Sequence, residues 1–250
     1  MRTVAFERAL RLAGYNRPLY AFGGAVALAA VAVGMTATSP LLRALAFVTA
    51  LGASWFLAAS FLAFHWMFDR SELTRWGWLA DEVGEPARWV QIHAGLEEAS
   101  APADALPRSE GMSLDVYDPA DMTEPAIAQA RRRRPVAATP ARFDALPVAD
   151  GWANAVVAIL VAHEIRDPAR RRRFFAELAR ILADDGTLVL VEHLRDLPAL
   201  LAFGPGVLHF LPRSEWLRRG PEAGLRLVRE RRITPFVRVF VFGKTAAGPT

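Results

Sequence analysis

The chain has 250 residues, 53% of them hydrophobic, and a formal net charge of +4 in which nearly all of the positive charge is arginine. It contains no cysteine, which excludes disulfides, thiolate metal sites and cysteine nucleophiles. The length allows one domain of roughly 170 residues with its own core, plus a further segment. The basic charge favours anionic partners such as nucleic acid, anionic lipid or anionic substrates.

Two long apolar segments lie near the N-terminus. Residues 19–36 carry no charge, and residues 41–68 contain only Arg43 and His65 as ionisable groups. A helix crossing a bilayer core needs about 20 apolar residues, and its backbone must satisfy its own hydrogen bonds there. Residues 36–40 leave room only for a tight turn, so residues 18–70 are predicted to form a transmembrane hairpin. The alternatives are a signal peptide, which the second apolar run opposes, and a buried soluble hairpin, which the absence of a charged face opposes.

Basic residues flank the hairpin on its open side and predict its orientation. They are Arg2, Arg8, Arg11 and Arg17 before the first helix and Arg70, Arg75 and Arg88 after the second. Both termini are therefore expected in the cytoplasm, in a membrane of the bacterial inner-membrane type, and Arg43 is expected to snorkel to the far interface. The tryptophans suited to interfacial positions are Trp55, Trp66, Trp76 and Trp78. Residues 1–17 have amphipathic helical spacing and lie either along the membrane surface or in solvent.

The rest of the sequence predicts an α/β domain. After a linker at residues 71–87, short apolar runs alternate with helical patterns over residues 88–245, and residues 246–250 form a tail. A helix is predicted at 168–182, with Asp167 as its N-cap. This alternation predicts a Rossmann-like, mostly parallel sheet with helices on both faces, whose last two strands are close enough for an antiparallel hairpin. The predicted strands are residues 88–93, 111–117, 153–161, 187–192, 225–230 and 237–242.

One long stretch carries a family resemblance. Residues 143–192 read FDALPVADGWANAVVAILVAHEIRDPARRRRFFAELARILADDGTLVLVE. This resembles the class I S-adenosylmethionine (SAM)-dependent methyltransferases of the small-molecule type, which share the acidic segment ending in Leu-Pro, the apolar strand, the helix ending in Arg-x-Leu, the Gly turn and the strand ending in Glu. The resemblance covers roughly residues 88–243 and implies SAM as the cofactor.

The resemblance also implies a cofactor site. Asp118 falls at the family's ribose-binding acid, and Asp144 matches the acid that contacts the adenine amino group, with Phe143 beside it for stacking. Capping of a turn or helix is the alternative for both acids, and a core position for Phe143. In the loop after the first strand only Gly95 remains of the family's Gly-x-Gly-x-Gly pattern. The predicted cofactor-binding residues are Gln91, His93, Gly95, Glu97, Asp118, Phe143, Asp144 and Ala162.

Histidines at strand ends are the catalytic candidates. His163 and Glu164 follow the third strand, where the methyl acceptor is expected, and a histidine with a near-neutral pKa can accept the acceptor's proton. His193, next to Glu192, follows the fourth strand, and a structural hydrogen bond is the alternative for each histidine. His209 lies in the apolar segment 197–212, which is either a lid or acceptor channel beside the membrane or a buried loop.

A metal site is not predicted, because His93, His163, His193 and Glu164 lack the spacing of a ligand cluster. Arginine runs at 131–134 and 170–173 are either solvated faces or contacts with anionic headgroups. Nucleic acid is not a predicted partner, because no aromatic platforms accompany these runs.

The sequence thus predicts a membrane-anchored SAM-dependent methyltransferase acting on a lipophilic, membrane-resident acceptor. The alternative is a membrane-tethered scaffold or binding module that keeps the fold without the activity. Gly23, Gly24 and Gly34 allow close helix packing, either in a homo-oligomer or within the hairpin.

Overall fold

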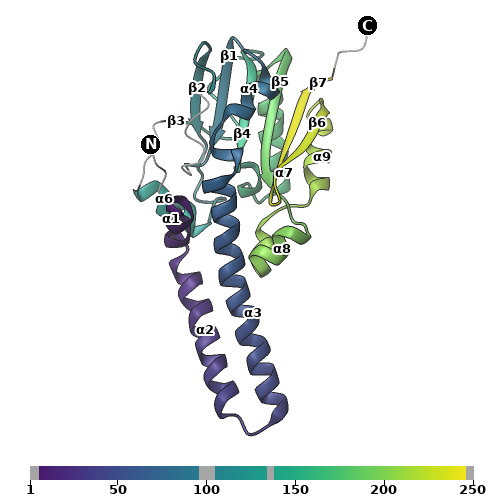
Figure 1. The fold of residues 1–250 in the computed structure, drawn as a ribbon. Helices are drawn as coiled ribbons and strands as arrows, with labels where there is room; N and C mark the ends of the chain where they lie inside the picture. The colour runs from purple at the N-terminus through teal and green to yellow at the C-terminus, as the bar shows by residue number, and fades with distance from the viewer. Residues whose placement is uncertain (1–5, 96–104, 134–137, 246–250) are drawn as a thin grey trace.

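The computed structural model describes residues 6–95, 105–133 and 138–245, and has an α/β domain from which a long helical hairpin projects (Figure 1). The hairpin consists of α2 (Arg17–Thr36) and α3 (Pro40–Phe64), and a π-helix, η1 (His65–Arg70), continues α3 into the domain. Pro40 takes the first position of α3, where a helix needs no N–H donor. Both helices are long and apolar enough to cross a membrane, in agreement with the predicted segments.

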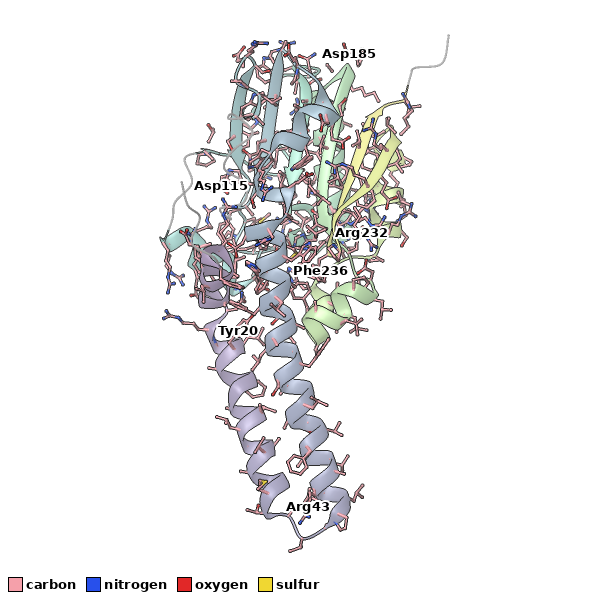
Figure 2. The ribbon with its side chains drawn as sticks, in the orientation of Figure 1. Tyr20, Arg43, Asp115, Asp185, Arg232 and Phe236 are labelled. Atoms are coloured by element: carbon pink, nitrogen blue, oxygen red, sulfur yellow. The ribbon has the colours of Figure 1, made fainter. Side chains whose placement is uncertain are left out.

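Most hairpin side chains lie outside any core. Only 17% of the most apolar window of each helix is buried, whereas the core helix of a soluble domain is mostly buried. The large exposed side chains are apolar and include Phe22, Leu28, Met35, Leu41, Leu51 and Trp55. The only charged side chain near the tip is Arg43, which donates to the Ala37 carbonyl at 3.0 Å (Figure 2).

Two of the three hairpin glycines pack the helices against each other. A Cβ added at Gly23 would lie 2.9 Å from Leu57, and one at Gly34 would lie 3.0 Å from Phe47. Gly24 has nothing within 4 Å of its Cβ position. Close approach within one chain therefore accounts for Gly23 and Gly34.

The N-terminal helix α1 (Glu7–Tyr15) is fastened to the base of the hairpin. The Arg8 N–H donates to Asp69 Oδ1 at 2.9 Å, and Gln129 Nε2 donates to the Tyr15 carbonyl at 2.8 Å. Its apolar face is buried through Ala9, Leu12 and Tyr15. That face therefore packs on protein, while Phe6 and Leu10 stay exposed, so contact of this segment with a membrane surface remains a prediction.

The sheet has seven strands in the order β3-β2-β1-β4-β5-β7-β6. The first five are mutually parallel, and β7 runs antiparallel to both β5 and β6. The predicted fold class, including the closing antiparallel hairpin, is confirmed. The strands are β1 (Arg88–His93), β2 (Glu110–Asp115), β3 (Thr139–Pro140), β4 (Ala153–Ile159), β5 (Leu182–His193), β6 (Leu225–Thr234) and β7 (Val237–Lys244).

Strand β5 begins earlier than the sequence predicts. Its register against β4 jumps from Ala153↔Leu182 to Ala155↔Thr187. The Asp-Asp-Gly segment at 184–186, which holds the Gly turn of the family resemblance, is therefore an irregularity within the strand, and pairing starts before it. Five positions along β5 here oppose two along β4, so this irregularity is larger than the usual β-bulge, which inserts one extra residue.

Helices cover both faces of the sheet. On one face Phe174, Phe175 and Trp216 join the strand core, and on the other Met67, Leu73 and Leu79 do so. The first group comes from α7 (Pro168–Ile181) and α9 (Arg213–Glu222), the second from η1, η2 (Glu72–Thr74) and α4 (Gly77–Val83). The remaining helices for which the structure describes bounds are α6 (Pro125–Arg133), η4 (Ala162–Glu164), α8 (Leu197–Phe203) and η5 (Gly204–His209).

The prediction of interfacial tryptophans is wrong at two positions. Trp76 and Trp78 are 5% and 4% exposed and belong to the core between the hairpin base and the sheet. The chain after α3 turns back onto the sheet through η2 and α4, which buries both rings. Trp55 and Trp66 stay exposed on α3 and η1.

Candidate active site

The carboxyl ends of the parallel strands face the hairpin. Figure 2 shows Asp115, the last residue of β2, on the hairpin side of the sheet, together with Phe236. The Phe236 carbonyl lies 3.2 Å from Nδ1 of His193, the last residue of β5. Asp185, near the start of β5, lies at the opposite end. In open α/β sheets ligands bind beyond the carboxyl ends of the strands, near the point where the strand order reverses, here between β1 and β4.

A pocket of about 300 Å³ lies beyond β2 and β3, within the size range of small-molecule sites. Its lining includes Asp118, Phe143 and Asp144, the three residues that the resemblance assigns to the adenosine part of SAM. The sequence therefore brings these three predicted residues into one pocket, although they come from two separate loops.

Asp118 serves both a local turn and the pocket. Its Oδ1 accepts the Ala120 N–H at 2.9 Å, and its Oδ2 pairs with Arg170 Nη2 at 2.5 Å. The Ala120 N–H, followed by Arg170, lowers the pKa of Asp118, so the carboxylate is ionised at neutral pH. An ionised carboxylate is the acceptor that a ribose diol requires.

Phe143 and Asp144 form the opposite wall. Phe143 is buried, and the Arg170 guanidinium lies 4.7 Å above its ring centre. Asp144 is held by Arg142, whose Nη2 lies 2.9 Å from Oδ1. Arg170 therefore covers the apolar ring and neutralises Asp118, which are the two groups that an adenosine would contact.

The end of β1 is built differently from a glycine-rich loop. Gln91 is buried within the strand and accepts a hydrogen bond from Ser113 at 3.0 Å. His93 Nδ1 accepts the Gly95 N–H at 2.9 Å, which leaves the buried His93 Nε2 without a partner among the described residues. Burial is the main cause that lowers the pKa of His93, so the ring is neutral. Glu97 lies outside the described residues.

Gly95 is conformationally required at this loop. Its φ is +87°, a region that L-residues with side chains rarely adopt, and an added Cβ would collide with Arg131. Arg131 lies 2.6 Å from Asp115, donates to the Ala94 carbonyl at 3.1 Å and stacks on Tyr117. A side chain of the predicted basic face thus turns inward and joins the ends of β1 and β2.

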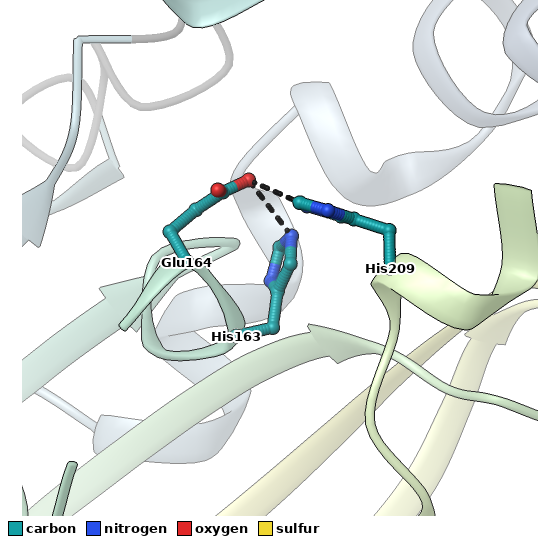
Figure 3. Close-up of side chains that lie close together, drawn as sticks. All are labelled: His163, Glu164 and His209. Carbon is teal, nitrogen blue, oxygen red and sulfur yellow. Dashed lines mark hydrogen bonds and ion pairs between the residues drawn. The ribbon is translucent and has the colours of Figure 1, made fainter. Parts of the chain in front are cut away.

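A histidine and glutamate cluster lies at the ends of β4 and β5 (Figure 3). His163 Nδ1 is 2.5 Å from Glu192 Oε2, and His163 Nε2 is 3.2 Å from Glu164 Oε1. His209 Nε2, from η5, lies 3.1 Å from the same Glu164 oxygen. The rings of His163 and His209, from two distant parts of the sequence, therefore meet at the same oxygen of Glu164.

The expectation of a near-neutral pKa at His163 is not met. Burial alone would lower its pKa, but the charges of Glu192 and Glu164 outweigh burial and raise it to about 10. His163 therefore keeps its proton at neutral pH and is not a general base in this state. His193 has the opposite character: burial, followed by the charge of His163, lowers its pKa to about 3.

His193 presents one unprotonated nitrogen. Because the Phe236 carbonyl can only accept, the 3.2 Å contact requires a proton on His193 Nδ1 and leaves Nε2 as an acceptor. The ring stacks on Phe210, with centroids 4.6 Å apart. His163, Glu164 and His193 thus share one site with His209, whereas the adenosine-type pocket beyond β2 and β3 is lined by other residues.

Sequence reasoning missed the inward roles of Arg131 and Arg170. Each is the first residue of an arginine run, and composition alone does not show which member of a run turns towards the protein. Ala162 was predicted as a cofactor residue; its N–H donates to Glu192 Oε1 at 2.8 Å, so it also helps to fix the histidine cluster.

Comparison with known proteins agrees with this geometry. Residues 110–190 match a family model described as a methyltransferase domain. A SAM-dependent methyltransferase from Thermotoga maritima is similar in structure, with a TM-score of 0.50 and 17% identity over 76% of this chain and all of that one. A 1,6-didemethyltoxoflavin-N1-methyltransferase from Burkholderia thailandensis, solved with its substrate and S-adenosylhomocysteine, gives a TM-score of 0.50 and 14% identity over 78% of this chain and 87% of that one. A search of curated proteins finds no sequence match.

The chain therefore carries a methyltransferase domain on the class I SAM-dependent methyltransferase fold. The predicted family is confirmed at this level, and with it S-adenosylmethionine as the methyl donor of the family. The adenosine half of the site fits this donor, because an ionised Asp118, the buried Phe143 ring and a pocket of about 300 Å³ lie together.

Proposed function

We propose that this protein is a membrane-anchored methyltransferase that transfers the methyl group of SAM to a lipophilic acceptor drawn from the bilayer. The observation that carries the proposal is the orientation of the sheet: its ligand-binding edge faces an apolar hairpin long enough to span a membrane (Figures 1 and 2). An acceptor dissolved in lipid would then reach the site without crossing water.

The donor would be held mainly by its adenosine part. Asp118 would accept the ribose hydroxyls, Phe143 would stack on the adenine and Asp144 would lie at the adenine amino group. Arg170 must move away from Asp118 and Phe143 for this to happen. Gly95 would lie beside the methionine part.

The acceptor path is proposed beneath α8 and η5. The Trp55 indole of α3 donates to the Leu201 carbonyl at 2.9 Å, so α8 rests against the hairpin. Apolar side chains exposed on these two helices extend the apolar surface of α3 towards the His163 cluster; they are Leu197, Leu200, Leu201 and Leu208. A surface of this kind suits burial in the lipid headgroup and acyl boundary.

The chemistry is in-line displacement, which depends mainly on positioning. The bond between the sulfonium and its methyl group breaks as the methyl bonds to an oxygen, nitrogen, sulfur or carbon of the acceptor. S-adenosylhomocysteine leaves, and the proton of the acceptor's X–H group passes to solvent. His193 Nε2 would accept a hydrogen bond from the acceptor and orient it. With a pKa of about 3, it orients the acceptor's X–H group and does not remove its proton at neutral pH.

The second candidate function is a tethered binding module without activity. It is favoured by the salt bridge between Arg170 and Asp118 and by the loss of loop glycines. It is opposed by the retained pocket and by the buried ionisable cluster of His163, Glu164, Glu192 and His193 at the ends of β4 and β5.

Calorimetric titration of SAM and S-adenosylhomocysteine into the full chain in detergent separates the two functions. We expect micromolar binding that Asp118→Ala weakens by at least about tenfold, the value of one charge-assisted hydrogen bond to ribose. Asp150→Ala, which removes an exposed acid outside the pocket, is the matched control. Absence of binding at millimolar ligand by a folded protein would reject the methyltransferase.

A further inference from the structure

The cluster of His163, Glu164 and His209 is more elaborate than a hydrogen-bonded pair requires. From its geometry we infer that these three side chains form a binding site for a divalent transition metal of the zinc type, although the sequence alone predicts none. The ligand atoms would be His163 Nε2, His209 Nε2 and a carboxylate oxygen of Glu164 (Figure 3).

The spacing of the ligand atoms fits one ion. All three lie within 4.8 Å of one another, with Glu164 Oε1 at 3.2 Å from His163 Nε2 and 3.1 Å from His209 Nε2. Ligands about 2.1 Å from a tetrahedral zinc are separated from each other by about 3.4 Å. Only small shifts would bring the three groups to this geometry.

The outer contacts are those that orient metal ligands. His163 presents Nε2 because its Nδ1 is held at 2.5 Å by Glu192, which is fully buried and fixed through its other oxygen by the Ala162 N–H. A carboxylate behind a metal-bound histidine is the usual arrangement. His209 likewise has a carboxylate behind it, because Glu124 Oε2 lies 3.8 Å from its Nδ1.

Glu164 supplies the independent sign of a missing ligand. Its side chain is 4% exposed, and its Oε2 is buried with no hydrogen-bond partner in the described part of the chain. A buried carboxylate oxygen without a partner is costly. An ion held by both oxygens of this carboxylate would satisfy Oε2, which the contacts of His163 and His209 with Oε1 leave unpaired.

The two histidines are also tied together through their backbones. Arg166 Nη1 donates to the carbonyls of His163 and His209, at 3.2 Å and 2.5 Å. This contact holds η4 against η5 and sets the distance between the two rings. Two imidazoles and one carboxylate suit zinc, cobalt, iron or manganese and disfavour magnesium and calcium, which prefer oxygen ligands alone.

Three protein ligands leave a fourth position open, as in catalytic zinc sites. His209, with 27% of its side chain exposed, is the most accessible of the three ligands. This step alone rests on the proposed function: an acceptor hydroxyl or thiol would occupy the open fourth position. The ion would lower the pKa of the acceptor, and the proton would pass to solvent.

The test is titration of Co²⁺ into the chelator-treated full chain in detergent, followed by visible absorption and competition with Zn²⁺. We expect one equivalent of Co²⁺ to give the absorption bands of a four-coordinate ion, with Zn²⁺ displacing it and Mg²⁺ having no effect. His209→Ala, at the least buried ligand, should weaken binding at least about 100-fold, and Glu192→Gln about 10- to 100-fold. His65→Gln is the control, since His65 pairs with Asp69 away from the site.

Absence of cobalt bands at millimolar Co²⁺ in a folded protein, or unchanged affinity in His209→Ala, would overturn the metal site in favour of a purely proton-bridged cluster. The outcome of the SAM titration is independent of the outcome of the cobalt titration. Metal binding without SAM binding would keep the metal site and reject methyl transfer.

Discussion

At the residue scale, Arg170 decides whether the adenosine-type pocket is open. It pairs with Asp118 at 2.5 Å and Asp121 at 3.2 Å, and covers the Phe143 ring. SAM carries a net positive charge and needs the same carboxylate, so Arg170 competes with it by contact and by repulsion. We expect Arg170→Ala to tighten SAM binding about fivefold, which corresponds to about 1 kcal/mol for a partly exposed ion pair.

Calorimetry on the detergent-solubilised chain measures this change. Arg172→Ala is the matched control, because Arg172 lies in the same run and is exposed, and does not line the pocket. Weaker binding in Arg170→Ala than in the control would mean that Arg170 contacts the donor instead of competing with it.

The residues of this site were predictable to different degrees. Asp118, Phe143 and Asp144 follow from their motif positions, and the structure places them in one pocket. The cluster around Glu164 was predicted only in part, because His209 reaches it from a segment 45 residues further along the chain. Such a contact depends on how η5 packs, which no local pattern encodes.

At the scale of elements, a buried ion cluster joins the two helices on the α7 face. Glu215 of α9 accepts from Arg171 Nε of α7 and from Arg219 Nε, each at 2.8 Å, and all three side chains are at most 8% exposed. Glu215→Gln leaves the buried guanidinium of Arg171 without a countercharge, and leaves Arg219 with only Glu222, at 2.5 Å. We expect a loss of about 3 kcal/mol in the free energy of unfolding, a fall in Tm of several degrees.

Thermal unfolding in detergent measures this loss, with Glu85→Gln as the control. The Glu85–Arg108 pair is over 80% exposed on both sides, so its loss should change stability by less than about 1 kcal/mol. Equal effects of the two substitutions would contradict the assignment of the cluster as a structural joint.

The same cluster predicts a pH dependence. Burial raises the pKa of Glu215, but hydrogen bonds from Arg218, Arg219 and Arg171 outweigh it and lower the pKa from 4.5 to about 2. A carboxyl whose folded pKa is depressed stabilises the protein fully above its unfolded value and loses that contribution as the pH falls. The difference in Tm between the parent and Glu215→Gln should therefore shrink progressively from about pH 5 towards pH 2.

Apolar periodicity predicted the strands better than their ends. β1 has the predicted bounds, because Arg88 and His93 bracket a short run that is buried in the sheet. The irregularity in β5 and the two-residue β3 have no such signal, since their pairing is set by the neighbouring strand. Trp76 and Trp78 were misplaced for a related reason: their burial depends on the chain turning back after α3.

At the scale of the whole molecule, the hairpin lies on the same side of the domain as the ligand-binding edge of the sheet. The ends of the parallel strands, the exposed leucines of α8 and the base of α3 lie on the same side of the domain (Figures 1 and 2). If the hairpin spans a bilayer, the candidate site lies next to the membrane surface. The hydrogen bond from Trp55 to the Leu201 carbonyl holds α8 against α3, so α8 would then lie between the site and the lipid.

Membrane orientation can be measured directly because the chain has no cysteine. Single cysteines introduced as Thr38→Cys at the hairpin tip and Asp185→Cys at the far end of the domain report opposite sides of a spanned bilayer. Basic residues on the open side predict a cytoplasmic domain. We expect a membrane-impermeant maleimide to label Thr38→Cys in intact bacterial cells, and to label Asp185→Cys only after the cells are permeabilised.

The parent chain is the blank for both variants. Protection of both cysteines in intact cells, with labelling of both after permeabilisation, would place the tip and the domain inside the cell, and the hairpin would then not cross the membrane. Labelling of Asp185→Cys in intact cells would reverse the orientation and put the SAM pocket on the side without cytoplasmic SAM. The proposed enzyme therefore requires that the tip and the domain lie on opposite sides, with the domain inside.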